Sequence, residues 1–306
     1  MENKEVQKST RECGMLVTVA SQGTGKTHAN KHLICNYAMD KIATKVRGRK
    51  VLIFDVNSEY ETTSFGIEGI PKQEVKGLAV SDVAAWCNSN VVDVRRINVR
   101  TLHMDDKLKV LNHVIQEVKN CLFVIEDINK IVLDVAHLKQ IVGTIVGLRH
   151  RAVDVIVSYQ ALRDVPPRFL SNCKYVRMHY FSGDAADVAK KLTEPEVYRL
   201  AQLIVNKRYY EAVRDFKAGK ISDLEHKKRR SFCVYIWTDP HKIEGEFTRD
   251  EFVEACKKYL LINKSAVKDR QLITGCSIDE AMSLEAEELI LKYYGNSDEP
   301  KKNIRK

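Results

Sequence analysis

The sequence contains no run approaching the roughly 18 consecutive apolar residues that a membrane-spanning helix requires. Its first segment, Met1 to Arg11, is polar and lacks the apolar core of a secretory signal peptide. The chain has no internal repeat and no low-complexity tract. We therefore expect a globular cytoplasmic protein without a membrane span.

The cysteines include no Cys-x-x-Cys pair, the spacing typical of zinc and redox sites. The eight cysteines stand at positions 13, 35, 87, 121, 173, 233, 256 and 276. Several of them lie in apolar segments, as Cys121, Cys173 and Cys233 do. This distribution favours buried, reduced thiols in a cytosolic protein.

The length and composition are those of an ordinary globular protein with a basic charge. The 306 residues suffice for one large α/β domain and a smaller appendage. Hydrophobic residues make up 44% and charged residues 30%, so a sizeable core can form. The net charge of +9 favours a polyanionic partner such as nucleic acid. Many basic proteins bind no nucleic acid, so the charge alone leaves this open.

Short apolar segments alternate with helical patterns through residues 1–182. The expected strands are Met15 to Ala20, Val51 to Asp55, Val91 to Val99, Leu122 to Ile125, Val153 to Ser158 and Tyr175 to Met178. The expected helices are Lys26 to Ile42, Asp106 to Asn120 and Val135 to Leu148, with a loop at Gly66 to Gly77. Apolar strands separated by helices predict an α/β core with a mainly parallel sheet flanked by helices. Such sheets bind ligands at the carboxyl ends of their strands.

The pattern changes after residue 182. We expect residues 183–295 to form a smaller, mostly helical α+β extension with a basic segment, and residues 296–306 to form a disordered tail. The extension is expected to contain helices at Asp184 to Phe216, Arg249 to Leu261 and Ile278 to Tyr294, with a strand at Phe232 to Thr238.

A phosphate-binding pattern follows the first expected strand. The segment is Ala20-Ser21-Gln22-Gly23-Thr24-Gly25-Lys26-Thr27, which matches the P-loop except for Ala20 in place of the first glycine. Its glycines allow backbone N–H groups to turn toward phosphate, and the helix N-terminus adds partial positive charge. We predict that the residues from Ser21 to His28 bind ATP, that Lys26 reaches the β- and γ-phosphates, and that Thr27 binds Mg²⁺. The alternative is a chance Gly-Lys-Thr in a strand–helix turn.

Two acids end the expected strand Leu122 to Ile125. Neighbouring parallel strands would bring Glu126 and Asp127 beside the P-loop. One acid would hold Mg²⁺ through water, and the other would orient or deprotonate the attacking water. By position we assign Glu126 to the metal and Asp127 as the catalytic base. The commoner order is Asp then Glu, so the two roles stay exchangeable, and a solvated strand end is the alternative.

Further polar residues flank the expected strand Val153 to Ser158. Gln160 follows it, where a polar side chain can contact the γ-phosphate or the attacking water, or simply occupy a loop. Arg149 and Arg151 precede it, and either could be an arginine supplied to a neighbouring subunit's phosphate. Further candidates are Arg163 and Arg168. A solvated basic turn accounts equally well for each arginine.

Asp55 ends the second expected strand and Glu59 follows it, and these two acids either line the site or cap a loop. His28 and His32 stand one helical turn apart, but no third metal ligand is evident. We therefore expect these two histidines to lie on an exposed helix face.

A basic run, His226-Lys227-Lys228-Arg229-Arg230, is the clearest feature of the last 120 residues. It fits either phosphate-backbone contact or a solvated linker. The aromatic residues Phe232, Tyr235 and Trp237 alternate in the next expected strand, so we expect some of them in the core.

Together these features resemble the FtsK–HerA superfamily of DNA-pumping ATPases, over roughly Cys13 to His179. The resemblance rests on Gly23 to Thr27, Val51 to Asp55 with Glu59-Tyr60, Val124 to Asp127, Arg149 to Arg151, Val155 to Gln160, and Asp164 to Cys173. The chain is most similar to viral genome-packaging ATPases and zonula-occludens-toxin-like phage assembly proteins. The resemblance implies a RecA-like core, a hexameric ring, and ATP hydrolysis at subunit interfaces that moves DNA through a central channel. It also implies capsid or portal partners and a place in the host cytoplasm or the virion.

Two other function classes fit the same motifs. One is a small-molecule kinase or phosphotransferase, although no lid or acceptor-site pattern is evident. The other is a nucleotide-dependent assembly scaffold with slow turnover that ignores DNA. ATP hydrolysis stimulated by DNA would distinguish the translocase from both.

Overall fold

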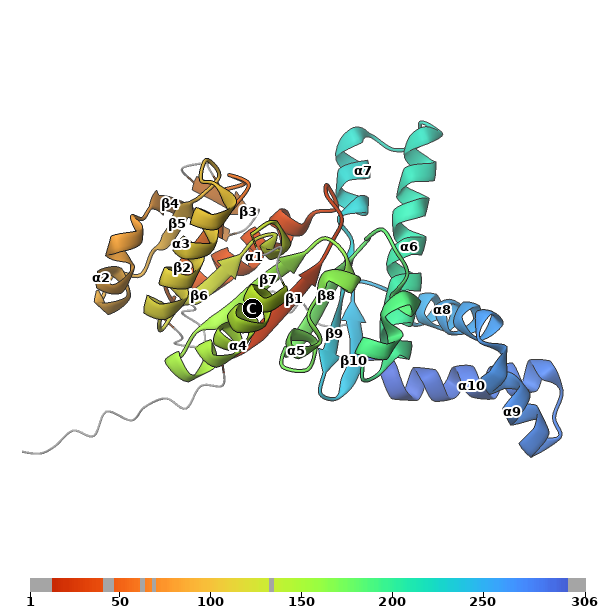
Figure 1. The fold of residues 1–306 in the computed structure, drawn as a ribbon. Helices are drawn as coiled ribbons and strands as arrows, with labels where there is room; N and C mark the ends of the chain where they lie inside the picture. Colours follow the sequence, from red (N-terminus) through yellow and green to blue (C-terminus); the bar gives the residue numbers. More distant parts are fainter. Residues whose placement is uncertain (1–12, 41–46, 61–63, 68–69, 132–134, 297–306) are drawn as a thin grey trace, which may run out of the picture. The chain divides into compact units, whose positions relative to one another are not determined.

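The computed structural model describes residues 13–40, 47–60, 64–67, 70–131 and 135–296 (Figure 1). The chain forms two compact units, and each is built from two separate stretches of sequence. The first unit contains Met1–Met15 and Lys31–Ile156, and the second contains Leu16–Asn30 and Val157–Lys306. Helix α1 (Lys26–Ala38) and strand β7 (Asp154–Tyr159) each run from one unit into the other. The units therefore divide the chain at other points than the predicted boundary between residues 182 and 183.

The first unit has a sheet in the order β6-β2-β5-β4-β3. Its strands are β2 (Val51–Asp55), β3 (Ser64–Ile67), β4 (Ile70–Gly77), β5 (Val94–Asn98) and β6 (Leu122–Ile125). Strand β2 pairs in parallel with β5 and β6, and β4 pairs in parallel with β5, whereas β3 is antiparallel to β4. Every residue of β2 and β6 is buried, as expected for parallel strands covered on both faces.

The predicted loop at residues 66–77 was wrong, because this segment contains part of β3 and all of β4. From Lys72 to Lys76, exposed side chains alternate with half-buried ones, so the segment is polar at every second position. The backbone of β4 pairs with β5 through Val75, Lys76 and Gly77. Pairing with a neighbouring strand thus makes a strand of a sequence whose composition favours a loop.

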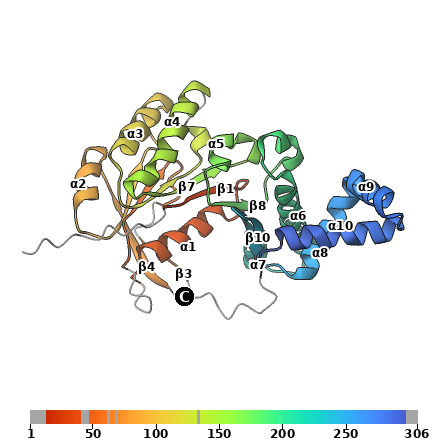
Figure 2. The ribbon, with the colours of Figure 1, turned by 90° about the horizontal axis from the view of Figure 1, so that it is seen from below.

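Helices cover the first unit's sheet. They are α2 (Val83–Asn88), α3 (Met104–Glu117) and α4 (Val135–Gly147). Helices α3 and α4 lie on one face, and the part of α1 in this unit lies on the other (Figure 2). Helix α3 buries Leu111, Val114 and Ile115, which share one helical face. The helix-covered parallel sheet that the sequence predicts is confirmed, and the segments after β2 and β6 lie at one edge of it.

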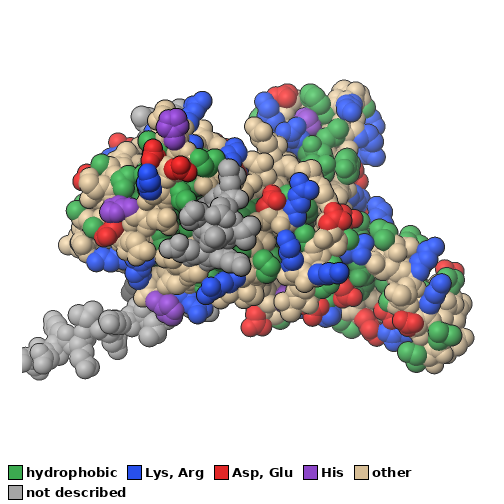
Figure 3. All heavy atoms as spheres, in the orientation of Figure 1, with side chains coloured by type: hydrophobic (Ala, Val, Ile, Leu, Met, Phe, Trp, Pro, Cys, Tyr) green, Lys and Arg blue, Asp and Glu red, His purple; other side chains and the backbone are tan. Residues whose placement is uncertain are grey.

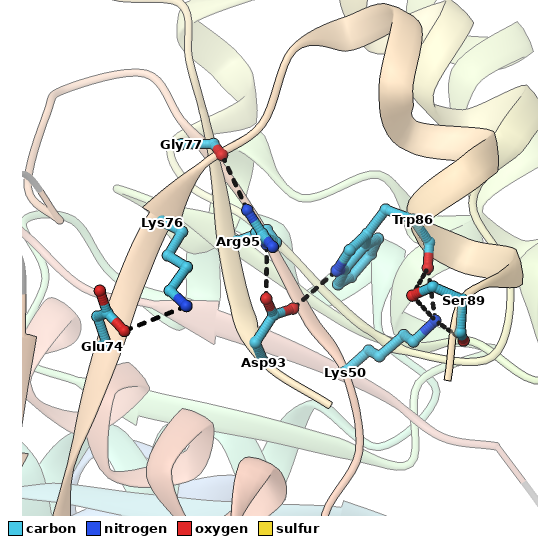
Figure 4. Close-up of polar contacts among 8 residues, drawn as sticks. All are labelled: Lys50, Glu74, Lys76, Gly77, Trp86, Ser89, Asp93 and Arg95. Carbon is cyan, nitrogen blue, oxygen red and sulfur yellow. Dashed lines mark hydrogen bonds and ion pairs between the residues drawn. The ribbon is translucent and has the colours of Figure 1, made fainter. Parts of the chain in front are cut away.

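A buried lysine fixes the opposite edge of this sheet, where the strands begin. Lys50 donates hydrogen bonds to the carbonyl oxygens of Trp86 and Ser89, each at 2.5 Å (Figure 4). The Trp86 indole donates to Asp93 at 2.8 Å, and Asp93 pairs with Arg95 at 2.7 Å. Burial lowers the pKa of Lys50. These bonds tie α2 to the starts of β2 and β5.

The second unit has a sheet in the order β10-β9-β8-β1. Its strands are β1 (Met15–Val19), β8 (Tyr175–His179), β9 (Cys233–Thr238) and β10 (His241–Gly245). Strands β1 and β8 are parallel, and the pairs β8–β9 and β9–β10 are antiparallel. In β9 the aliphatic Val234 and Ile236 are buried, whereas Tyr235 and Trp237 are half-buried. The core face of β9 is therefore the aliphatic one.

The remaining helices belong to the second unit. They are α5 (Pro167–Leu170), α6 (Pro195–Lys217), α7 (Asp223–Arg230), α8 (Arg249–Ile262), α9 (Lys264–Thr274) and α10 (Ile278–Tyr293). Helices α6 and α7 form a hairpin, called here the α6–α7 hairpin, that turns at Gly219 with φ at +67° (Figure 1). Capping boxes at Thr248 and Ser277 begin α8 and α10. The basic run is thus the end of a helix.

The chain's last described residue is held in place. The Asn296 side chain donates to the carbonyl oxygens of Gly245 and Phe247 and accepts from the Gly245 N–H. The rest of the predicted tail, 297–306, lies outside the described residues. No helix in the described ranges combines the length and the apolarity needed to cross a membrane. The cysteines carry free thiols, and five of them are buried: Cys35, Cys87, Cys121, Cys173 and Cys256.

Candidate nucleotide site

The P-loop lies in the second unit, between β1 and α1. Backbone hydrogen bonds hold its first residues on both sides. The N–H of Ala20 donates to the carbonyl oxygen of Tyr159 at 3.0 Å, and that of Ser21 donates to Tyr180 at 2.9 Å. The Ser21 hydroxyl in turn accepts from the N–H of Ser182 at 2.9 Å. The ends of β7 and β8 therefore set the position at which the loop leaves β1.

The two loop glycines adopt the conformations that a P-loop requires. Gly23 has φ at +75° and Gly25 has φ at +86°, values that favour glycine because a Cβ is strained there. The Thr24 hydroxyl donates to the carbonyl oxygen of Ser21 at 2.7 Å and closes the turn. Turns of this kind form concave sets of N–H groups that bind anions.

The loop supplies donors that fit a nucleoside triphosphate with its metal ion. Lys26 is 9% exposed, at the first position of α1, and Thr27 follows it half-buried. Within the predicted set from Ser21 to His28, Gln22 and His28 are exposed. Backbone donors and a lysine suit phosphate oxygens, and a threonine hydroxyl suits Mg²⁺, which takes its other ligands from phosphate and water. In the described part of the chain, no group of three or more His, Cys, Asp or Glu side chains could hold a metal ion.

Two basic residues of β8 lie buried beside this loop, and the sequence motifs did not identify them. Arg177 is fully buried and donates to the Thr18 hydroxyl at 2.9 Å and to the Asn30 side-chain oxygen. His179 is also fully buried, against the backbone of Thr24 and Ser231. Burial and the nearby charges of Arg177 and Lys26 lower the pKa of His179 from 6.5 to about 3. The surroundings of the loop therefore favour negative charge.

The acidic strand end lies in the first unit, after β6. Glu126 is fully buried and accepts a hydrogen bond from the Tyr60 hydroxyl at 2.6 Å. Asp127 is 3% exposed and has φ at +42°. Its carboxylate accepts from the Asn57 amide at 2.9 Å and lies 3.3 Å from the Lys130 ammonium. These neighbours orient two adjacent carboxylates at the edge of the sheet that binds ligands in this class of fold.

Asp55 has a structural task at the same edge. It is fully buried and accepts from the backbone N–H groups of Glu59 at 3.0 Å and Tyr60 at 3.1 Å. Arg96 lies 3.5 Å away. Of the two sequence interpretations, these contacts favour the one in which Asp55 caps the loop. The capped loop positions the Tyr60 hydroxyl to donate its hydrogen bond to Glu126.

An open groove of about 620 Å³ borders the partners of Asp127 in the first unit. It is lined by Val56, Asn57, Arg100, Met104, Lys107, Asn129 and Lys130. Asn57 was absent from the predicted site. Its only sequence signal is its place two residues after Asp55, at the end of a buried strand.

Gln160 and Arg151, two further predicted site residues, lie near opposite ends of β7. Gln160 follows the β7 residue that accepts from Ala20, so it lies at the start of the P-loop. Arg151 instead caps α3 by donating to the carbonyl oxygens of Ile115 and Gln116. Its own carbonyl accepts from Asn120, ahead of β6 and thus at the opposite end of that strand from Glu126.

Three other predicted arginines lie on the surface: Arg149, Arg163 and Arg168. Whether any arginine serves a neighbouring subunit stays a prediction, as do the individual catalytic assignments.

Comparison with known proteins gave only structural likenesses. No protein-family model and no curated protein sequence matches the chain. The genome packaging NTPase B204 of Sulfolobus turreted icosahedral virus 2 with ATP-gammaS is similar over 76% of this chain and 95% of that one, at 14% identity and a TM-score of 0.45. The N-terminal domain of zonular occludens toxin from Neisseria meningitidis is similar over 56% of this chain and 79% of that one, at 14% identity and a TM-score of 0.29.

Proposed function

We propose that this protein is a P-loop ATPase that moves DNA, and that it packages a viral or phage genome as a ring of identical subunits. The observation that carries the proposal is the loop between β1 and α1. It has left-handed glycines at positions 23 and 25 and Lys26 at the start of the helix. This arrangement supports binding of ATP with Mg²⁺.

Hydrolysis is supported by the two acids after β6. Thr27 and Glu126 would hold Mg²⁺, whose positive charge would offset the negative charge of the phosphates. In this proposal Glu126, oriented by Tyr60, would help to hold the metal ion, and Asp127, oriented by Asn57, would accept the proton of the attacking water. Gln160, at the start of the P-loop, would hold that water in line with the γ-phosphate. The two carboxylate roles can be exchanged without changing the reaction.

Movement of DNA is supported by the basic charge and by its distribution. Lys and Arg side chains gather over the α6–α7 hairpin (Figure 3). Lys217, Lys220, Lys227 and Lys228 are exposed there. Such side chains can contact backbone phosphates without reading sequence. A ring would bring one hairpin per subunit to the DNA, with a capsid or portal protein as partner, in the host cytoplasm or the virion.

The proposal is tested by the steady-state ATPase rate without DNA, with double-stranded DNA and with single-stranded DNA. We expect a Mg²⁺-dependent rate that rises with at least one form of DNA. Lys26→Ala should abolish the activity, because the lysine contacts the phosphates. A matched control is Lys109→Ala on α3, whose ammonium is exposed and pairs with Asp106.

Each other outcome of this assay identifies a different function. Transfer of phosphate to a small molecule, without a response to DNA, would contradict the translocase and indicate a kinase. Slow hydrolysis that ignores DNA, with assembly that requires ATP, would indicate a scaffold. Activity that survives in Lys26→Ala would contradict the nucleotide site itself.

A further inference from the structure

The C-terminal end of the α6–α7 hairpin contacts the P-loop of the same subunit. The Arg230 guanidinium donates a hydrogen bond from Nη2 to the carbonyl oxygen of Gly23 at 2.6 Å. The next residue, Ser231, packs against the second loop glycine, so that a Cβ on Gly25 would lie 2.2 Å from the Ser231 Cβ. Residues 207 positions apart in the sequence therefore meet at the loop expected to hold phosphate.

Arg230 differs from Lys227 and Arg229 of the same helix in how its charge is balanced. Lys227 pairs with Asp223 at 2.6 Å, and Arg229 pairs with Glu225 at 2.8 Å. Among the residues that the structure describes, Arg230 forms no ion pair, and its buried Nε has no hydrogen-bond partner. A guanidinium has five N–H donors, and a single neutral carbonyl engages one of them. Donors and charge thus remain for an anionic group beside the loop.

The other side chains at the loop also favour an anion. Lys26 begins α1, and the buried Arg177 is bonded to the neutral side chains of Thr18 and Asn30. His179, between the backbones of Thr24 and Ser231, is held neutral by burial and by these positive charges, which lower its pKa to about 3. Arg230 adds a further cation to the same part of the second unit.

We propose that Arg230 binds the terminal phosphate of the nucleotide in its own subunit. The inference rests on the proposed ATP site. The loop's backbone N–H groups would surround the inner phosphates, whereas Arg230 contacts the loop at the carbonyl oxygen of Gly23. The planar guanidinium can give two parallel hydrogen bonds to one phosphate, which a lysine cannot. Arg230 thereby distinguishes ATP from ADP. Although it belongs to the basic run, Arg230 binds the nucleotide and not DNA.

The hairpin that carries Arg230 contacts the P-loop region at a second point. The carbonyl oxygen of Tyr180 accepts from Ser21, and the Tyr180 ring stacks on Tyr209 of α6 with centroids 3.7 Å apart. Within the hairpin, the rings of Phe216 and His226 stack at 4.2 Å and join α6 to α7. These contacts connect the surroundings of the P-loop to the helices that carry the exposed lysines.

The test measures binding of fluorescent ATP-gammaS and fluorescent ADP, with Mg²⁺ and without DNA, by fluorescence anisotropy. We expect Arg230→Ala to lower the affinity for the ATP analogue by roughly 10- to 100-fold, the usual loss when hydrogen bonds to a charged group are removed. The affinity for ADP should fall by less than about threefold, because ADP lacks the terminal phosphate. Arg230→Lys should fall between Arg230→Ala and the wild type. Arg214→Ala removes the same charge from the exposed surface of α6 and should bind both nucleotides as the wild type does.

Equal affinity of Arg230→Ala and wild type for the ATP analogue would overturn the inference. So would an equal loss for both nucleotides, since Arg230 would then only shape the loop. If Arg230→Ala does not fold, Arg230→Lys decides by the ratio of its two affinities. Loss of binding in Lys26→Ala, with both Arg230 variants like the wild type, would sink the inference and leave the proposed function standing. A wild type that binds neither nucleotide would contradict both.

Discussion

The P-loop of the second unit and the acidic strand end of the first unit are built on opposite principles. The P-loop presents backbone N–H groups, with Lys26, Arg177 and Arg230 as cations around it. The acidic end presents the carboxylates of Glu126 and Asp127, held by donors from other segments. One arrangement favours an anion and the other favours a cation or a water molecule. The two halves of the proposed reaction therefore depend on different atoms, so mutations can separate them.

The largest expected effect separates hydrolysis from binding. Asp127→Asn keeps the shape of the side chain and its bond with Asn57 but removes the base. We expect the hydrolysis rate to fall by about 10²- to 10⁴-fold, while ATP affinity changes by less than about threefold. Rate and affinity are measured on the same preparation, with Asp105→Asn on the exposed start of α3 as control. Unchanged turnover would contradict the assignment of Asp127 as the catalytic base, and Glu126→Gln would be the next variant to measure.

The second effect concerns the backbone of the P-loop. Gly25→Ala places a Cβ at φ +86° and 2.2 Å from the Ser231 Cβ, so the loop must move. The left-handed conformation alone costs about 1–2 kcal/mol, and nucleotide affinity should fall by at least tenfold.

Gly147→Ala is the matched control for that variant, because Gly147 has φ at −70° and no atom within 4 Å of an added Cβ. Its nucleotide affinity should equal that of the wild type. Wild-type affinity in Gly25→Ala would show that phosphate is held elsewhere.

The third effect is on stability and comes from His179. Its folded pKa of about 3 lies below its ordinary value of 6.5, so the unfolded chain binds a proton in this range that the folded chain does not. The stability contribution is therefore complete above pH 6.5 and declines as the pH falls toward 3, by at most about 1.4 kcal/mol per pH unit.

Chemical denaturation between pH 7 and pH 4 measures this decline. His179→Gln should flatten the pH dependence, whereas His113→Gln, at an exposed position of α3, should leave it as in the wild type. The same slope in both variants would show that His179 is not the group responsible.

The smallest effect concerns DNA. Replacing Lys227 and Lys228 with serine removes two exposed cations from the α6–α7 hairpin. If both contact phosphates, the slope of log K against log salt should become shallower by about 1.8, with no change in sequence preference. DNA binding is measured from 50 to 200 mM salt, with Lys109→Ser on α3, an exposed lysine outside the hairpin, as control. An unchanged slope would move the DNA surface away from α7.

The basic run shows how far one segment can be interpreted without its tertiary contacts. As sequence, His226 to Arg230 is one patch of positive charge. In the fold, His226 is buried against Phe216, Arg229 pairs with Glu225 and Asp215, and Arg230 reaches the P-loop. Helical geometry sends consecutive side chains in different directions, so neighbours in the run acquire different tasks.

The conformation of the P-loop and the position of the acidic strand end could be predicted because their signals are local. The glycines at positions 23 and 25 indicate a left-handed backbone conformation. The apolar segment Leu122 to Ile125, followed by two acids, indicates a buried strand that ends at a surface. Each signal lies within about ten residues, where the spacing of residue types decides the local structure.

Tertiary structure alone decided which distant residues complete these segments. Tyr60 and Asn57 form hydrogen bonds with the two acids. His179 and Arg177 lie buried beside the strand that precedes the P-loop. Arg230 contacts Gly23, which is 207 positions away in the sequence. Tertiary structure also made a strand of residues 70–77, through pairing with β5. The physical reason is that burial, partner charge and strand pairing depend on what the rest of the chain places nearby, whereas glycine conformation and apolar periodicity are properties of the segment itself.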